Sequence, residues 1–184
     1  TALRRIEELE AEVEKLGKLV DRDVLIPAIL NRRGIENRLA PLLEEAFHAS
    51  DKRREQPSVR RICVAYCDLD HFKEVNDFYG HKSGDEVLLS FAGLVHRRVR
   101  KMDLVGRLGG DEFIVVFLNS DYEEANVKMR LITDEFKAQK FSFDPDVGMT
   151  FSFGIACAQE FQEMSVLISA AELRMRGAKG DKAR

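Results

Sequence analysis

Two apolar segments joined by a very short polar turn constrain the fold of this chain more than any other feature. Residues 104–108 (LVGRL) and 113–118 (FIVVFL) are separated only by the sequence GGDE. A connection this short cannot hold a helical crossover, so the two segments are expected to pair as antiparallel strands. A third segment at 59–70 (VRRICVAYCDLD) is rich in apolar residues and is predicted to be a buried strand of the same sheet.

The remaining hydrophobic pattern predicts helices between and around these strands. We expect helices at about 31–50, 71–79, 83–101, 121–139 and 163–177, a polar loop at 51–58, and short strands near 141–143 and 148–158. From residue 59 onward the order is β-α-α-β-β-α-β-β-α. This order is typical of an α+β domain with a central, largely antiparallel sheet flanked by helices.

The first residues follow a different pattern, which predicts that residues 1–22 form a stalk and residues 23–184 a folded domain. Apolar residues alternate spacings of three and four over residues 2–22, as in a parallel two-stranded coiled coil. The residues concerned are Ile6, Leu9, Val13, Leu16 and Val20. A homodimer through this stalk is the expectation, and a single amphipathic helix lying on its own domain is the alternative.

Composition limits the cellular setting and the partners. The 184 residues carry a formal net charge of −3, which argues against a broad surface for a nucleic acid polymer. Cys63, Cys67 and Cys157 are odd in number and lack metal-ligand spacing, so we expect buried thiols in a reducing, cytoplasmic setting. The apolar runs are too short to span a bilayer, and no signal peptide or lipidation motif is recognised.

Acidic residues follow two of the predicted strands. Asp68 and Asp70 end the strand at 59–70 on the same side of an extended chain, and Asp111 and Glu112 lie in the turn after two glycines. Carboxylates from two strand ends are the ligands that Mg²⁺ prefers, together with substrate phosphates. Acids at strand ends can also be mere solubilising residues, and any one of them alone is best interpreted so.

The wider motif makes the interpretation specific. Residues 67–88 (CDLDHFKEVNDFYGHKSGDEVL) contain the pattern D-x-D-x-F-K-x-x-N-D-x-x-G-H-x-x-G-D, and residues 107–113 read RLGGDEF. Together with FSFGIA at 151–156, this resembles the GGDEF-domain diguanylate cyclases over about residues 23–184. The resemblance implies a fold like the palm of nucleotide cyclases and polymerases. It also implies a bacterial enzyme that condenses two GTP into cyclic di-GMP and two pyrophosphates, each domain of a dimer holding one GTP.

The resemblance also assigns roles to individual residues. Mg²⁺, or Mn²⁺ in its place, would be held by Asp68, the backbone carbonyl of Leu69, Asp111 and Glu112. Asp111 and Glu112 would be the catalytic residues, with Asp111 deprotonating the 3′-hydroxyl. The substrate-binding residues would be His71 and Phe72 through their backbone N–H groups, Lys73 and Lys179 at the triphosphate, Asn76 and Asp85 at guanine, and Gly109 and Gly110 where backbone approaches the nucleotide. For Asn76 and Asp85 the alternative is helix capping.

A second site and two departures from the family pattern follow from the same comparison. Arg100 and Asp103 match the inhibitory site that binds product, although R-x-x-D can also be an ion pair at a helix end. The hinge at 23–33 lacks the usual Thr-Gly, and Asp23 is expected to contact Arg107 electrostatically. Near the C-terminus the usual Asp and Tyr are replaced by Glu172 and Arg176, which makes the role of Lys179 less certain than that of Lys73.

Three functions remain open at this point. The first is an active, product-inhibited diguanylate cyclase controlled through its stalk. The second is a catalytically silent receptor that binds GTP or cyclic di-GMP and signals to a protein partner. The third is another nucleotide cyclase or polymerase-like enzyme with the same palm, which would need a base reader other than Asp85. The complete pentapeptide and the intact Asp68 favour the first.

Overall fold

The computed structural model describes residue 5, residues 20–48 and residues 59–182. Most of the predicted stalk, from Ile6 to Leu16 of the heptad pattern, lies outside the described residues, as does the predicted loop at 51–58. The coiled coil therefore stays a prediction. Among the described residues no helix is long and apolar enough to cross a membrane.

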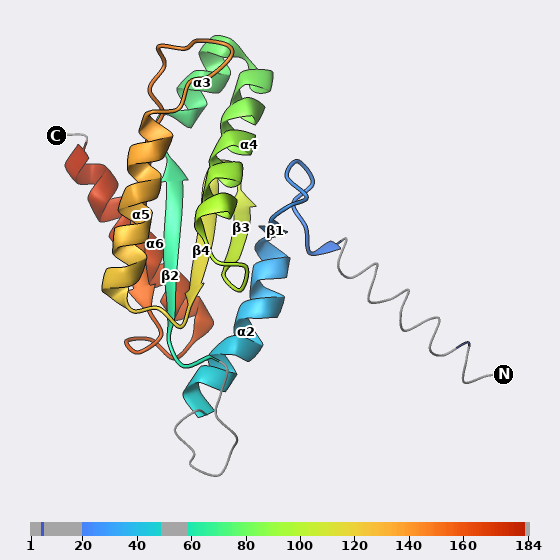
Figure 1. Cartoon of the computed structure of the whole chain (residues 1–184), viewed down its shortest axis with the longest axis vertical. Helices are drawn as coiled ribbons and strands as arrows, with labels where there is room; N and C mark the ends of the chain where they lie inside the picture. Colours follow the sequence, from blue (N-terminus) through green and yellow to red (C-terminus); the bar gives the residue numbers. More distant parts are fainter. Residues whose placement is uncertain (1–4, 6–19, 49–58, 183–184) are drawn as a thin grey trace.

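The domain is built on a five-stranded sheet with the strand order β1-β3-β4-β2-β5 (Figure 1). The strands are β1 (Leu30–Asn31), β2 (Ile62–Leu69), β3 (Leu104–Gly109), β4 (Glu112–Leu118) and β5 (Phe151–Cys157). The helices are α2 (Arg32–His48), α3 (Phe72–Tyr79), α4 (His81–Arg98), α5 (Tyr122–Lys137) and α6 (Met164–Lys182). Only the short β1 pairs in parallel, so the predicted α+β fold with a largely antiparallel sheet is confirmed.

β2 lies inside the sheet because both of its edges are paired. It runs antiparallel to β4 on one side and to β5 on the other, and seven of its eight residues are buried. A strand covered on both faces needs an almost continuous apolar sequence, which ICVAYC supplies. β3 and β4 form the predicted hairpin, with an irregularity between Arg107 and Gly109 just before the turn.

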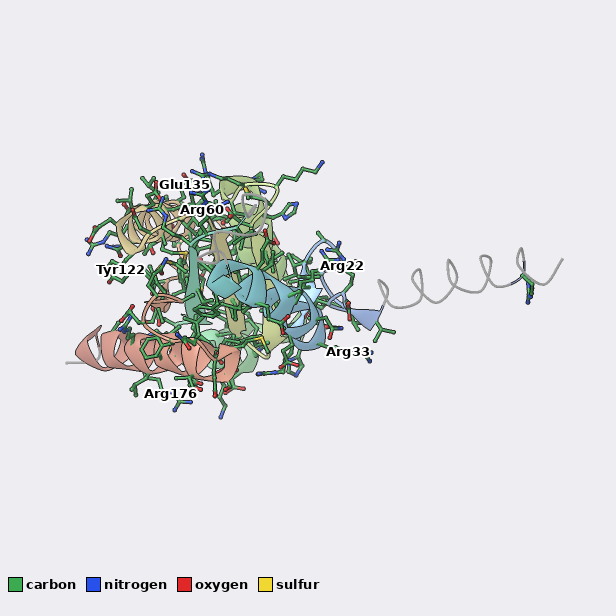
Figure 2. All side chains as sticks on the ribbon, turned by 90° about the horizontal axis from the view of Figure 1, so that it is seen from below. Arg22, Arg33, Arg60, Tyr122, Glu135 and Arg176 are labelled. Atoms are coloured by element: carbon green, nitrogen blue, oxygen red, sulfur yellow. A yellow bond between two sulfur atoms is a disulfide. The ribbon has the colours of Figure 1, made fainter. Side chains whose placement is uncertain are left out.

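Each face of the sheet is covered by its own hydrophobic cluster. One cluster joins the sheet to α3, α4 and α5, and Phe91 at its centre makes edge contacts with Phe113, Phe136 and Phe151. The other cluster joins the opposite face to α2 and α6. Figure 2, seen from below, shows α4 and α5 on one side of the sheet and α6 on the other. The result is a three-layer sandwich in which the sheet lies between two layers of helices.

The segment predicted as a strand at 141–143 is instead irregular in structure. Phe141 is buried and packs edge-on against Phe136, while Phe143 stacks on Phe141 and contacts Tyr79. The apolar residues that suggested a strand are thus used to fill space beneath the helices. The strand expected near 148–158 is confirmed as β5, and the two-residue β1 was not predicted because so short a bridge leaves no periodicity.

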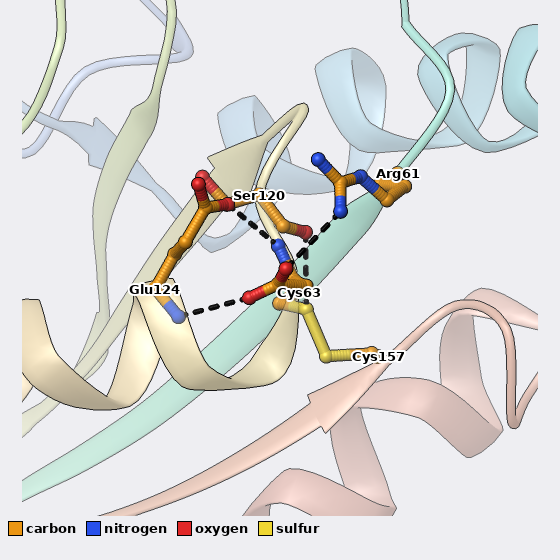
Figure 3. Close-up of polar contacts among 6 residues, drawn as sticks. Arg61, Cys63, Ser120, Glu124 and Cys157 are labelled. Carbon is orange, nitrogen blue, oxygen red and sulfur yellow. Dashed lines mark hydrogen bonds and ion pairs between the residues drawn. A yellow bond between two sulfur atoms is a disulfide. The ribbon is translucent and has the colours of Figure 1, made fainter.

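The expectation of three buried thiols was wrong for two of the cysteines. Cys63 of β2 and Cys157 of β5 lie directly opposite each other, with their Cα atoms 4.0 Å apart, and form a disulfide (Figure 3). The register of two strands 94 residues apart in sequence produces this pairing, and no spacing rule within the sequence could reveal it. Cys67 is a free buried thiol, and burial raises its pKa, which makes it unreactive.

Candidate active site

The end of β2 and the beginning of β4 lie side by side and bring two predicted residues together. The register pairs Asp68 with Glu112 directly across the two strands. Side chains alternate along a strand, so Asp68 lies on the same face as Tyr66, the face that packs against α6. The backbone N–H of Leu69 donates to the carbonyl of Asp111 at 3.2 Å, which ties the turn before β4 to the end of β2.

Two glycines and an arginine shape the turn that carries Asp111. Gly109 has a φ of 153° and Gly110 a φ of 51°, and residues other than glycine rarely adopt such backbone conformations. Apart from each glycine and its chain neighbours, no atom of the described residues lies within 4 Å of where the Cβ would be, so backbone conformation rather than crowding requires glycine. Arg107 donates from Nε and Nη2 to the Gly110 carbonyl at 2.9 and 2.7 Å and thereby stabilises the turn.

Asp68 affects the ionisation of Asp111 and binds a lysine side chain. Burial raises the pKa of Asp111, and the charge of Asp68 raises it further, against the opposing effects of Lys179 and Arg107. Lys179 on α6 donates from Nζ to Asp68 Oδ1. Burial alone would lower the pKa of Lys179, but the hydrogen bond to Asp68 and the nearby carboxylates outweigh it and raise that pKa. The lysine is therefore a charged partner of an acidic cluster.

The donor set at this strand end fits Mg²⁺ better than a metal with a complete protein cage. Among the described residues no group of three or more His, Cys, Asp or Glu side chains is arranged to hold a metal by itself. Mg²⁺ needs no such group, because it usually binds one or two carboxylates and keeps waters and substrate phosphates in its shell. Asp68, Asp111 and the Leu69 carbonyl offer only oxygen, and Asp68 already binds a cationic group.

Asp70 lies on the same face as Asp68, but its carboxylate makes structural hydrogen bonds. Its two carboxylate oxygens accept hydrogen bonds from Thr150 Oγ1 at 2.7 Å and Ser152 Oγ at 2.8 Å, and its backbone N–H donates to the Thr150 carbonyl. The residue is only 6% exposed. Asp70 thus clamps the end of β2 to the beginning of β5.

The two residues assigned to guanine lie on the adjacent helices α3 and α4. Asn76 is half-buried beside Gly84, where a Cβ would lie only 2.1 Å from Asn76 Oδ1, so glycine is needed for the two helices to approach. Asp85, which follows Gly84 on α4, is exposed. Backbone N–H groups close the end of α3, and no side chain caps the start of α4, so helix capping does not explain either residue.

Three of the residues assigned to the triphosphate lie at the start of α3, while Lys179 lies on α6. His71 precedes the helix in a left-handed conformation with φ 59°, and its exposed ring contacts Glu74 Oε1 at 2.7 Å. Phe72 is buried in the core, as its apolar side chain requires, so only its backbone could serve a ligand. Lys73 is exposed.

The predicted inhibitory pair lies elsewhere, at the end of α4. Arg100 and Asp103 line a surface pocket of about 370 Å³ together with further basic residues: Arg22, Arg38, His96 and Lys101. The Asp103 side chain is 1% exposed and accepts from the backbone N–H groups of Arg100 at 2.8 Å and Leu118 at 3.0 Å. The Arg100 contact is made by its backbone, so the alternative of an ion pair between the two side chains is not what the structure contains.

Comparison with known proteins decides the family. The family model described as "Diguanylate cyclase, GGDEF domain" matches residues 22–184. The chain belongs to the GGDEF family. An uncharacterised signalling protein of Caulobacter vibrioides is 35% identical over 84% of this chain but only 18% of its own length. The diguanylate cyclase TpbB of Pseudomonas aeruginosa is 32% identical over 93% of this chain and 38% of its own length. The chain thus spans well under half of these relatives.

Solved structures of GGDEF domains have the same fold. The GGDEF domain of TpbB is 31% identical, with a TM-score of 0.75, over 87% of this chain and 89% of that one. The coiled coil and GGDEF domain of DgcB from Caulobacter crescentus, in complex with c-di-GMP, has a TM-score of 0.80. It covers 98% of this chain and 91% of that one at 22% identity, and it therefore supports the fold alone.

The structure shows ordered contacts at both departures from the GGDEF pattern. In the hinge, Asp23 accepts from the backbone N–H groups of Leu25 and Ile26 at 3.0 and 2.8 Å. Its Oδ1 also lies 3.6 Å from Arg107 Nη1, which confirms the expected electrostatic contact. On α6, Glu172 and Arg176 form an ion pair with each other. Lys179 still reaches Asp68, so the altered sequence before it does not displace it from the acidic cluster.

Sequence reasoning missed one residue at this end of the GGDEF domain. Tyr66 is buried in the cluster under α6, and burial together with the nearby Glu112 carboxylate raises the pKa of its hydroxyl. The family motif as quoted above begins at Asp68, so the pattern gives no reason to look two residues earlier. Only the alternation of side chains along β2 could have placed Tyr66 on the face of Asp68.

Proposed function

We propose that this GGDEF domain is a diguanylate cyclase, which condenses two GTP into cyclic di-GMP with release of two pyrophosphates. One observation carries the proposal. Asp68 at the end of β2 lies opposite Glu112 at the start of β4, the Leu69 N–H donates to the Asp111 carbonyl, and Lys179 donates to Asp68. Carboxylates and a cation arranged together are what in-line phosphoryl transfer requires, because that chemistry needs positioning and charge neutralisation.

The residues take the following roles. Asp68, the Leu69 carbonyl, Asp111 and Glu112 hold Mg²⁺ or Mn²⁺, which when bound neutralises negative charge on the phosphates. Asp111 and Glu112 are the catalytic residues, and Asp111 accepts the proton of the 3′-hydroxyl as that oxygen attacks the α-phosphate. The bond to pyrophosphate breaks in the same step.

Substrate binding divides between the two ends of the nucleotide. Lys73 and Lys179, with the backbone N–H groups of His71 and Phe72, neutralise and orient the triphosphate. Asn76 and Asp85 read guanine, since a carboxylate accepts from N1–H and the exocyclic amine, and an amide both donates and accepts. Adenine lacks this donor pattern, so GTP is preferred to ATP. The open turn at Gly109 and Gly110 admits the nucleotide.

Assembly and control belong to the same proposal. Each domain holds one GTP, so two domains must face each other, and a parallel coiled coil in residues 1–22 would bring them together. Product binds the basic pocket that contains Arg100 and Asp103 and slows the enzyme. Arg100 suits phosphate, whereas the buried Asp103 orders the backbone of the pocket wall. We place the enzyme in the bacterial cytoplasm because its substrate is GTP; the Cys63–Cys157 disulfide removes the argument from buried thiols.

The test is to incubate the protein at high concentration with GTP and Mg²⁺ and to separate the nucleotides by chromatography. Cyclic di-GMP is expected from the parent and from the exposed control Asp134→Asn, and none from Asp111→Ala. Product formation should stall as cyclic di-GMP accumulates, less so in Arg100→Ala than in Arg97→Ala, which changes an exposed arginine outside the pocket. A preparation that is dimeric and binds GTP but makes no product would contradict the proposal and favour the silent receptor.

A further inference from the structure

The two helices that carry the proposed guanine residues meet at a single glycine. Asn76 lies in the last turn of α3 and Asp85 in the second turn of α4, and only Gly80 separates the two helices. Gly80 has a φ of 87°, and apart from its chain neighbours no atom of the described residues lies within 4 Å of where its Cβ would be. Crowding at Gly80 itself therefore does not fix the angle between the two helices.

The helices touch each other at the level of the proposed guanine residues. A Cβ on Gly84 of α4 would lie 2.1 Å from Asn76 Oδ1 of α3. Asp85 is the next residue along α4. A small change in the angle between α3 and α4 would thus change the separation of Asn76 and Asp85, and with it the way in which both can bind one base.

The segment between α5 and β5 runs beside this joint and binds both helices (Figure 1). The Tyr79 hydroxyl, at the end of α3, donates to Asp144 Oδ2 at 2.8 Å. The backbone N–H of Ser142 donates to Glu86 Oε1 of α4 at 2.6 Å, and its hydroxyl donates to Glu86 Oε2. Two nearby residues of one segment thus bind α3 and α4 on either side of the joint.

The α5–β5 segment is itself held in place. Phe141 is only 3% exposed and belongs to the hydrophobic cluster beneath the helices. Phe143 stacks on Phe141 and contacts the Tyr79 ring, with centroids 4.9 Å apart. The Asp146 backbone N–H donates to Asp144 Oδ1 at 2.9 Å, while Oδ2 accepts from Tyr79. A segment that is anchored in the core can hold the two helices at a set angle.

We infer that Tyr79 and Glu86 are positioning residues for guanine recognition. By binding the α5–β5 segment they set the angle between α3 and α4, and hence the separation of Asn76 and Asp85. The inference rests on the proposed function, because it concerns the base that those two residues read. A carboxylate can accept from both N1–H and the exocyclic amine of guanine only when its position and angle suit both hydrogen bonds.

The experiment measures the binding of 3′-deoxy-GTP and 3′-deoxy-ITP by isothermal titration calorimetry with Mg²⁺. Both analogues lack the attacking hydroxyl, and the inosine analogue also lacks the exocyclic amine. The parent should prefer the guanine analogue about tenfold or more, because inosine loses a hydrogen bond to a charged acceptor. In Tyr79→Phe and in Glu86→Ala this preference should fall about threefold or more. The controls Tyr122→Phe and Glu36→Ala change exposed residues of α5 and α2 and should keep it.

A conservative variant separates positioning from charge. Glu86→Gln keeps an acceptor for the Ser142 backbone N–H but removes the charge next to Asp85, and it should retain most of the guanine preference. An unchanged preference in both Tyr79→Phe and Glu86→Ala would overturn the inference. Equal weakening of both analogues in these variants would overturn it too, as would a Gln variant that behaves like the Ala variant. A parent protein that does not prefer the guanine analogue would instead overturn the proposed reading of guanine.

Discussion

At the start of β2, around Cys63, the contacts stabilise the sheet, whereas at its end, around Asp68, groups of like charge gather. The first end has the disulfide to Cys157, and Cys63 Sγ lies 3.4 Å from the Ser120 carbonyl oxygen (Figure 3). Asn119 accepts from the Arg60 backbone N–H and donates to the Arg61 carbonyl. Polar groups at this end are satisfied by local partners.

The other end of the same strand is electrostatically costly. The pKa of Asp111 is raised by burial and by Asp68, which means that its charged form is disfavoured in the folded protein. Lys179 offsets part of this cost. The comparison shows that stabilising contacts at one end of a strand can accompany repulsion between carboxylates at the other end. A bound ligand can then offset that repulsion.

Reducing the disulfide should have the largest effect. Cross-linking residues 94 apart in sequence is expected to contribute about 4–5 kcal/mol by restricting the unfolded chain. Thermal unfolding with a reductant should therefore occur roughly 10–15 °C lower than without it. Cys67→Ala should keep this sensitivity and Cys63→Ala should lose it. An unfolding temperature that reductant does not change would contradict the disulfide.

Asp111→Asn should reduce activity strongly without loss of stability. Losing about 4 kcal/mol of charge stabilisation lowers the rate of cyclic di-GMP formation about a thousandfold. The pKa of Asp111 is raised in the folded state, so its ionisation costs stability as pH rises through that value. The variant should then unfold at the same or a higher temperature than the parent at pH 7. Below the ordinary pKa of aspartate this difference should vanish, and a destabilised variant at pH 7 would contradict the electrostatic account.

Asp70→Ala tests a stabilising contact at the charged end of β2. Removing the acceptor of two hydroxyl hydrogen bonds should lower the free energy of unfolding by about 3 kcal/mol. Ser152→Ala and Thr150→Val should each lose about half as much, measured by urea unfolding. If all three variants are as stable as the parent, Asp70 does not clamp β2 to β5.

Asp121→Ala should have the smallest effect, confined to the secured end of the sheet. Asp121 accepts from the Glu124 backbone N–H, and Glu124 accepts from that of Asp121, both at 3.0 Å, which forms a capping box on α5. Loss of this capping box should lower the free energy of unfolding by about 1 kcal/mol and leave cyclic di-GMP formation unchanged. The control Arg61→Ala removes a half-exposed ion pair to Asp121 and should change stability by less than about 1 kcal/mol. Reversed magnitudes would show that the ion pair, not the cap, stabilises α5.

Local sequence features were enough to predict most of the elements. Alternation and apolar runs identified β2, β3, β4 and β5 because each strand buries at least one face. The segment at 141–143 was mistaken for a strand because Phe141 and Phe143 have the same apolar character whether they pair or fill a gap between helices. The predicted site residues Asp68, Glu112 and Asp111 lie together because β2 ends where its neighbour β4 begins.

The sequence by itself determined the fold class and, through the motif, which residues to examine. The tertiary structure alone decided which partner each residue has. The Cys63–Cys157 disulfide, the hydroxyls that donate to Asp70 and the Lys179 bond to Asp68 all join positions distant in sequence. The physical reason is that the periodicity of a sequence shows on which side of its own helix or strand a residue lies. Strand register and packing determine which residue lies opposite it.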